Sequence, residues 1–291
     1  MTWVNAVVQG FLLGGFYAVL ACGLALMFGV MRIINLAHGD LAVVGAYLIL
    51  LVLDHAHVSP FIGLIPVLPV MLIAGYVLQR TVLERSLRSG VLVPLLTTFG
   101  LSIVAQNLLL EIYSPDVRSL GGQAGSVATA SWQITNQISI SAIGALTLGG
   151  AIAILGGLQW FLSSTQAGRR MRATAQDADT AELVGIDSRA IYARATAIAV
   201  AIGAVGGMFL AIRSTFDPFT GPTQLIFAFE AVVIGGLGSL WGTLLGGIVL
   251  GVAQTIGAQI DPQYSVLAGH LVFLAVLASP RGGLLKVRAA T

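Results

Sequence analysis

Long apolar runs separated by short polar joints dominate the chain. The runs are continuous, without the period-two alternation of a transmembrane β-strand. A helix needs about 20 apolar residues to cross the hydrocarbon core of a bilayer. The pattern therefore predicts membrane-spanning helices in eight apolar blocks, at residues 4–31, 33–53, 61–79, 91–113, 138–162, 191–212, 225–260 and 266–279.

The composition agrees with the pattern. Of the 291 residues, 57% are hydrophobic and 9% are charged, with a mean hydropathy of +0.94. A soluble domain carries about 25% charged residues, so soluble and disordered classes are excluded. We expect an all-α polytopic membrane protein, a single transmembrane domain over residues 1–291 with a polar cytoplasmic loop at 163–190.

The polar joints differ in charge, which predicts their sides. Arginines and the single lysine gather in the third joint, the fifth joint and the tail, and these segments should face the cytoplasm. The joints at 54–60, 114–137 and 214–224 are poor in Lys and Arg and should lie outside, with the N-terminus. The cationic residues in question are Arg80, Arg85 and Arg88, then Arg169, Arg170, Arg172, Arg189 and Arg194, and finally Arg281, Lys286 and Arg288.

The seventh block is too long for one crossing. A straight helix over residues 225–260 would measure about 54 Å, and its middle reads GGLGSLWG, with Gly235, Gly236 and Gly238 at the expected break. A hairpin of two short or broken helices here gives about nine crossings, or eight if one element is re-entrant. Close helix packing is also expected at four GxxxG spacings, which are Gly10 with Gly14, Gly203 with Gly207, Gly242 with Gly246, and Gly247 with Gly251.

The segment 172–187 is too polar to cross the membrane but rich in helix-forming residues. It predicts one short helix in the cytoplasmic interface, with Ala175, Ala178 and Ala181 as a stripe of small residues on one face. Gly185 is expected to cap its C-terminus, and Asp187 or Ser188 to cap the following helix. An ordinary amphipathic connector is the alternative.

Polar groups inside apolar blocks are the candidates for a translocation path or gate. Asn35, His38 and Asp40 interrupt two blocks near the cytoplasmic boundary, and Glu230 precedes the glycine break. The glycines of that break, Gly235, Gly236 and Gly238, are candidates for the same path or gate. Ionisable groups at such depth usually face a protein interior or a water-filled cavity. The structural alternatives are an ion pair between Asp40 and Arg32 and a hydrogen-bonded interior role for His38. We expect Glu111 only to mark the membrane interface. We expect His270 and Cys22 only to pack against neighbouring helices.

The sequence lacks motifs for catalysis. It has no GxxxxGK[ST] phosphate loop, no HExxH and no GxSxG, and nothing in it favours a metal site or nucleic acid. Energy for transport would then come from an ion gradient, through residues such as Asp40 and Glu230, or from a separate ATPase.

Four segments resemble the permease subunit of bacterial branched-chain amino-acid ABC importers. They are GLALMFGVMRIINLAHGDLAVVGAYL, LLTTFGLSIVAQNLLLE, RRMRATAQDADTAELVGIDSRAI and FEAVVIGGLGSLWGTLLGGIVLG, in the same order and over nearly the whole chain. The resemblance implies a multi-pass protein of the bacterial plasma (inner) membrane. It also implies that the cytoplasmic segment couples to the ATPase through Arg172, Ala175, Asp177, Ala178, Ala181, Glu182, Gly185 and Asp187.

The same resemblance implies the other parts of the transporter. These are a second homologous permease subunit in a homo- or heterodimer, two ATPase subunits that hold ATP and Mg²⁺, and a periplasmic binding protein that delivers substrate. This chain is expected to hold no cofactor. The expected substrates are branched-chain or other hydrophobic amino acids, with urea, short amides or aromatic carboxylates as alternatives, and an ion-coupled secondary transporter as the alternative of another class.

Overall fold

The computed structural model describes residues 3–87, 90, 92–135 and 138–279. Within them, seven apolar helices are long enough to cross a membrane, and two shorter ones are present, so the predicted all-α polytopic class is confirmed. The long helices are α1 (Trp3–Met31), α2 (His38–Ala56), α3 (Pro60–Leu78), α5 (Leu92–Tyr113), α7 (Ala142–Ser164), α10 (Ser188–Arg213) and α12 (Leu240–Ile260), and the shorter ones are α11 (Gly221–Gly235) and α13 (Tyr264–Leu277).

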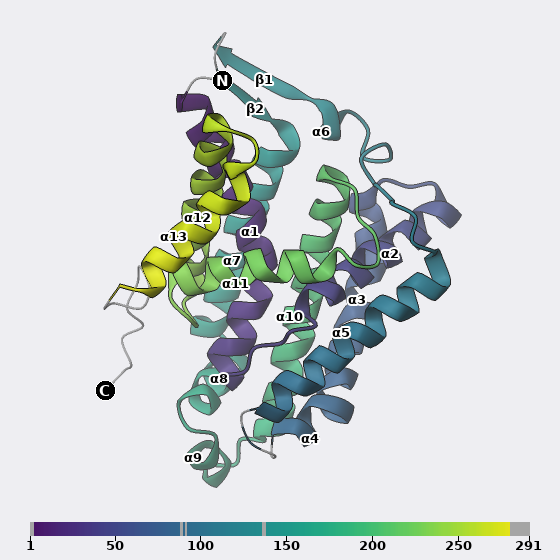
Figure 1. Ribbon diagram of the computed structural model, residues 1–291. Coiled ribbons are helices and arrows are strands. Elements are labelled where there is room, and N and C mark those ends of the chain that lie inside the picture. The colour runs from purple at the N-terminus through teal and green to yellow at the C-terminus, as the bar shows by residue number, and fades with distance from the viewer. Residues whose placement is uncertain (1–2, 88–89, 91, 136–137, 280–291) are drawn as a thin grey trace.

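The polar joints lie at two opposite ends of the bundle (Figure 1). At the N-terminal end, Gln9 donates a hydrogen bond to the carbonyl of Ser139 at 2.7 Å, and Arg118 pairs through its backbone with Phe216. At the other end, Arg189 lies 3.3 Å from Glu84. The predicted sorting of these joints is therefore confirmed, while their sides of a membrane stay a prediction, and the cationic tail after residue 279 lies outside the described residues.

Two joints contain regular structure that the sequence analysis missed. Joint 114–137 ends in a hairpin of β1 (Ser131–Thr135) and β2 (Ile138–Ser141), preceded by α6 (Ser126–Thr129). The third joint is helical, because α3 continues through the π-helical η1 (Gln79–Leu83) and α4 (Glu84–Leu87). The charged side chains of this extension can reach water without ending the helix.

Close backbone contacts at glycines hold the core together. On α1, Gly10 and Gly14 face α12, where a methyl group added to Gly247 would lie 2.7 Å from the carbonyl oxygen of Gly14. Gly207 and Gly246 contact the backbones of Ala42 and Ala231 in the same way. Close packing at the GxxxG spacings is confirmed, and because Gly10 faces Val252 while Gly14 faces Ile248, α1 and α12 run antiparallel.

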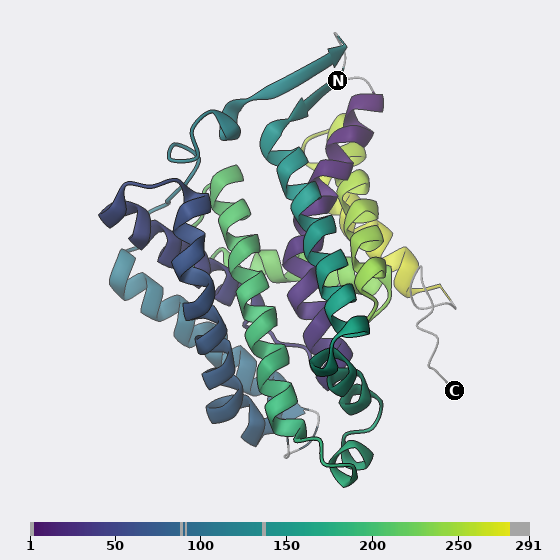
Figure 2. The same cartoon turned by 180° about the vertical axis from the view of Figure 1, so that it is seen from behind.

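The predicted break in the seventh block is confirmed, but its first half, α11, is too short to be one of two crossings. α11 ends at Gly235 and α12 begins at Leu240, with Gly236 and Gly238 at positive φ angles of 101° and 84°. Both views show α11 running across the bundle instead of along it (Figure 1 and Figure 2). Its 15 residues measure about 22 Å, less than the hydrocarbon core, so α11 enters the bundle and α12 returns to the N-terminal end.

Candidate functional site

The polar segment after α1 is not helical, in contrast to the predicted block 33–53. Arg32 ends α1 with a φ of 55°, and α2 begins only at His38. The side-chain oxygen of Asn35 accepts the amide of Ala37 at 3.0 Å, and Thr98 accepts the amide of Leu36 at 3.1 Å. Two side-chain acceptors, the local Asn35 and Thr98 on α5, therefore replace missing helical hydrogen bonds.

His38 lies deep in the bundle, not near the cytoplasmic boundary. Its Nε2 donates to the carbonyl of Leu20 at 3.0 Å, and its ring lies against Gly23, where a side chain would clash. Leu20 precedes the end of α1 by 31 − 20 = 11 residues, or about 16 Å. The segment 32–37 thus turns back into the bundle. The interior role considered for His38 is the one observed. Its Nδ1 has no hydrogen-bond partner among the described residues.

Asp40 is buried in the first turn of α2 and does not pair with Arg32, so the proposed tie is wrong. Its carboxylate accepts hydrogen bonds from Ser102 at 2.6 Å and from Gln106 at 3.0 Å, both on α5. Gly221, the first residue of α11, packs directly against Asp40. The two interrupted parts of the fold therefore meet at this carboxylate.

Glu230 belongs to a different polar cluster. It is 3% exposed and forms a hydrogen bond with Nδ1 of His270 on α13, so His270 has a polar partner that the packing interpretation missed. Nearby, Tyr17 donates to Gln254 at 2.5 Å, which joins α1 to α12. Nine residues of α11, about 13 Å, separate Glu230 from Gly221, and the structure does not bring Asp40 and Glu230 together.

A cavity lies between the glycine break and the end of the bundle that carries α8. It measures about 390 Å³ and lies between the last turns of α1 and α7, helix α8 (Gln166–Gln176) and the start of α12. Arg172 and Ala175 line it from one side, and Gly238, Ser239 and Trp241 from the other. Residues expected for ATPase coupling and for gating thus share one cavity.

The single helix expected over 172–187 is wrong, because the structure has two. α8 ends at Gln176, and α9 (Ala178–Leu183) follows after Asp177. Asp177 is the N-cap of α9, where it accepts the amides of Asp179 and Thr180 and the hydroxyl of Thr180. The hydrogen bonds from Thr180, with that from Asp179, lower the pKa of Asp177 below its usual range. The capping competes with helix continuation and breaks the segment.

The expected caps at the end of this segment are present, but the alanine stripe is not a continuous exposed face. Gly185 adopts a φ of 83° after α9, and Asp187 accepts the amide of Ala190 at the start of α10 at 3.2 Å. Ala181 is 4% exposed and packs within the chain. The apolar residues that do face outward are Leu183 and Val184, with exposed fractions of 87% and 73%, and no periodicity in the sequence pointed to them.

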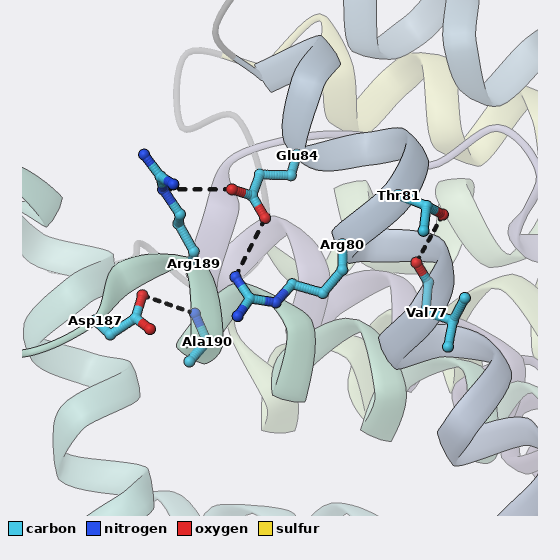
Figure 3. A network of polar contacts seen from close by, with 7 residues as sticks. All are labelled: Val77, Arg80, Thr81, Glu84, Asp187, Arg189 and Ala190. Atoms are coloured by element: carbon cyan, nitrogen blue, oxygen red, sulfur yellow. Dashed lines mark hydrogen bonds and ion pairs between the residues drawn. The ribbon is translucent and has the colours of Figure 1, made fainter.

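Figure 3 shows a charged network that the sequence analysis also missed. Glu84 accepts from Arg80 at 3.4 Å within the helical extension of α3, and it pairs with Arg189 in the first turn of α10. The i,i+4 spacing of Arg80 and Glu84 was visible in the sequence, whereas the third member depends on how α3 and α10 pack. The network fixes α10 directly after the α8–α9 segment.

The seven apolar membrane-spanning helices, together with the match to a permease family, identify a multi-pass permease of the inner membrane. The chain belongs to the family described as the permease component of the branched-chain amino acid transport system, whose model matches residues 6–277. No solved structure matches the chain significantly.

Its relatives include high-affinity branched-chain amino acid transport system permease proteins. BraD of Pseudomonas aeruginosa is 31% identical over 96% of this chain and 95% of its own length. LivH of Salmonella typhimurium is 30% identical over 94% and 92%, and LivH of Escherichia coli K12 is 28% identical over the same shares. The likeness therefore extends over nearly the whole of each protein.

Proposed function

We propose that this chain is the membrane-spanning permease subunit of an ATP-driven importer for branched-chain or other hydrophobic amino acids. The proposal rests on the family match over residues 6–277. A second permease, two ATPase subunits and a periplasmic binding protein would complete the transporter. ATP and Mg²⁺ would bind to the ATPase subunits, because the sequence of this chain contains no phosphate-binding loop.

The cavity beside α8 supports a route by which ATPase movement reaches the path. A displacement of α8 changes the space around Arg172 and Ala175, and the opposite wall of that space is the turn at Gly238. This turn joins the crosswise helix α11 to α12. Its glycine backbone can change conformation at small steric cost, so the turn is suited to act as the hinge of a gate.

Reconstitution in vesicles tests the proposed function. Uptake of labelled leucine should require ATP, the ATPase subunits and the binding protein. Uptake by this chain alone under a proton gradient would instead support the ion-coupled alternative, for which the hydrogen bond between the buried Glu230 and the partly exposed His270 is the specific favouring observation. Uptake of urea or an aromatic carboxylate, but not leucine, would retain the mechanism and change the substrate.

The transmission route has a separate test. Ala175→Phe should fill the cavity and prevent α8 from approaching the turn, while the exposed surface of α9 stays unchanged. ATPase association should persist and transport should fall. Gln176→Phe adds the same ring at an exposed neighbouring position outside the cavity, and equal transport by both variants would contradict the route.

A further inference from the structure

A second hollow, on another side of α8, has a different chemical character. It is an open groove of about 380 Å³ between α3, the end of α7, α8 and α10. The groove-facing surface is apolar, and Arg194 and Tyr76 line it with their carbon atoms. The apolar side chains that line it are Leu72, Ile73, Phe161, Met171, Ala197 and Ile198.

The groove lies across the expected membrane boundary. On α3, the apolar block ends at Gln79, and Leu72 precedes Arg80 by eight residues, or about 12 Å. On α10, Arg194 precedes the uninterrupted apolar run, and Ile198 follows one turn deeper. The apolar lining thus lies within the hydrocarbon core, and the charged rim lies at the headgroup level.

The rim carries two arginines, Arg170 and Arg194, for which no carboxylate among the described residues lies within ion-pair distance. Among the described residues, Arg80, Arg118 and Arg189 each have a carboxylate within ion-pair distance. Neither Arg194 nor Arg170 has a carboxylate within ion-pair distance among these described residues. Arg170 lies between two groove-lining residues of α8, Ala167 and Met171, and the spacing of three from Ala167 places it on the same helix face.

We propose that this groove binds one anionic phospholipid of the surrounding membrane, with an acyl chain against the apolar lining and the phosphate at Arg170 and Arg194. Basic pockets between helices at the cytoplasmic boundary suit anionic headgroups, and a phosphate oxygen forms strong charge-assisted hydrogen bonds with arginine. A second copy of this chain is a poorer occupant, because Glu84 is already paired and the acidic residues of α9 lie at the far tip of the bundle (Figure 1).

Native mass spectrometry of the full chain tests the proposal. Phosphatidylglycerol should be retained, and phosphatidylcholine with the same acyl chains should be lost more readily. Arg194→Gln should lower phosphatidylglycerol affinity about fivefold, and the double variant with Arg170→Gln about 25-fold, as expected from about 1 kcal/mol for each basic residue near a lipid surface. Arg118→Gln removes an equal charge at the opposite end and should leave the affinity unchanged.

A groove variant and two further measurements separate a lipid from other occupants. Ala167→Trp keeps every arginine but fills the groove, and it should displace the lipid. Phosphatidylglycerol should raise the unfolding midpoint, whereas inorganic phosphate at the same concentration should not. Equal retention of the two lipids, or an equal shift of the unfolding midpoint with phosphate alone, would overturn the proposal. Crosslinking of two copies of the chain through Ile198→Cys would also overturn it. The native Cys22 is buried and would not interfere with that crosslinking.

Discussion

Nε of Arg189 lies 3.3 Å from the carboxylate of Glu84 and so joins the first turn of α10 to the helical extension of α3. The side chain of Arg189 is 54% exposed, and exposed ion pairs contribute only about 0 to 1 kcal/mol. The ion pair therefore adds little stability, and its main effect is to fix the position at which the chain leaves α9. Breaking the pair should disturb the position of the start of α10 more than it lowers the free energy of unfolding.

Glu84→Gln should accordingly change the unfolding midpoint little but increase hydrogen exchange at the start of α10. A double-mutant cycle with Arg189→Gln, followed by thermal unfolding in detergent, should give a coupling of at most about 1 kcal/mol. A coupling of several kcal/mol would show that the pair is desolvated in the assembled transporter.

The glycine contact between α1 and α12 should tolerate no larger side chain. Gly251→Leu places a side chain against the backbones of Gly10 and Gly14, and overpacking of a fitted contact costs about 1 to 3 kcal/mol or more. A lower yield of folded protein and a lower unfolding midpoint are expected. Gly156→Leu is the matched control, because a side chain added at Gly156 on α7 meets no atom within 4 Å.

Topology can be checked with single cysteines and a membrane-impermeant thiol reagent. Gln123→Cys and Asp261→Cys should react in intact cells, because both positions belong to the end that carries the N-terminus (Figure 1). Gln176→Cys should react only after the cells are opened. Reaction of Asp261→Cys from the cytoplasmic side alone would contradict the predicted position of the α12–α13 joint on the same side of the membrane as the N-terminus.

Most of the helical bundle was predictable because apolar length and arginine placement are properties of local sequence. The break at Gly235 to Gly238 was found by length and glycine content, and the structure has it between the end of α11 at Gly235 and the start of α12 at Leu240. The depth of His38 was not predictable. It depends on contacts with Leu20 and Gly23, which belong to another helix.

In the candidate site too, features set by local sequence were predictable and contacts with other helices were not. The caps at Gly185 and Asp187 follow from residue type and spacing, and the structure has both. The partners of Asp40 and Glu230 lie on α5 and α13, beyond the reach of any local pattern. The prediction of a continuous alanine stripe was wrong because Asp177 can either extend α8 or cap a new helix, and in the structure it caps α9.

The cap at Asp177 should make α9 sensitive to acid. Because the folded-state pKa of Asp177 is lowered, its stabilising contribution is complete above the unfolded pKa of about 3.9 and is lost as the pH falls through the folded value. Hydrogen exchange at the amides of Asp179 and Thr180 should rise in Asp177→Ala at neutral pH. Asp177→Asn keeps a capping oxygen, so the protection of these amides relative to their intrinsic exchange rate should persist and should not change as the pH falls.

The outward residues of α9, not its alanines, should decide ATPase association. Leu183→Ser with Val184→Ser removes two apolar side chains that are 87% and 73% exposed, so the isolated chain should keep its unfolding midpoint but fail to co-purify with the ATPase. Ala181→Trp should instead destabilise the chain itself by about 1 to 3 kcal/mol or more, because Ala181 is buried. Val117→Ser changes an exposed apolar residue at the opposite end and should affect neither property. If the double serine variant binds the ATPase and transports at the normal rate, the tip of α9 is not the docking surface, and the segment around Arg80 and Glu84 becomes the next surface to test.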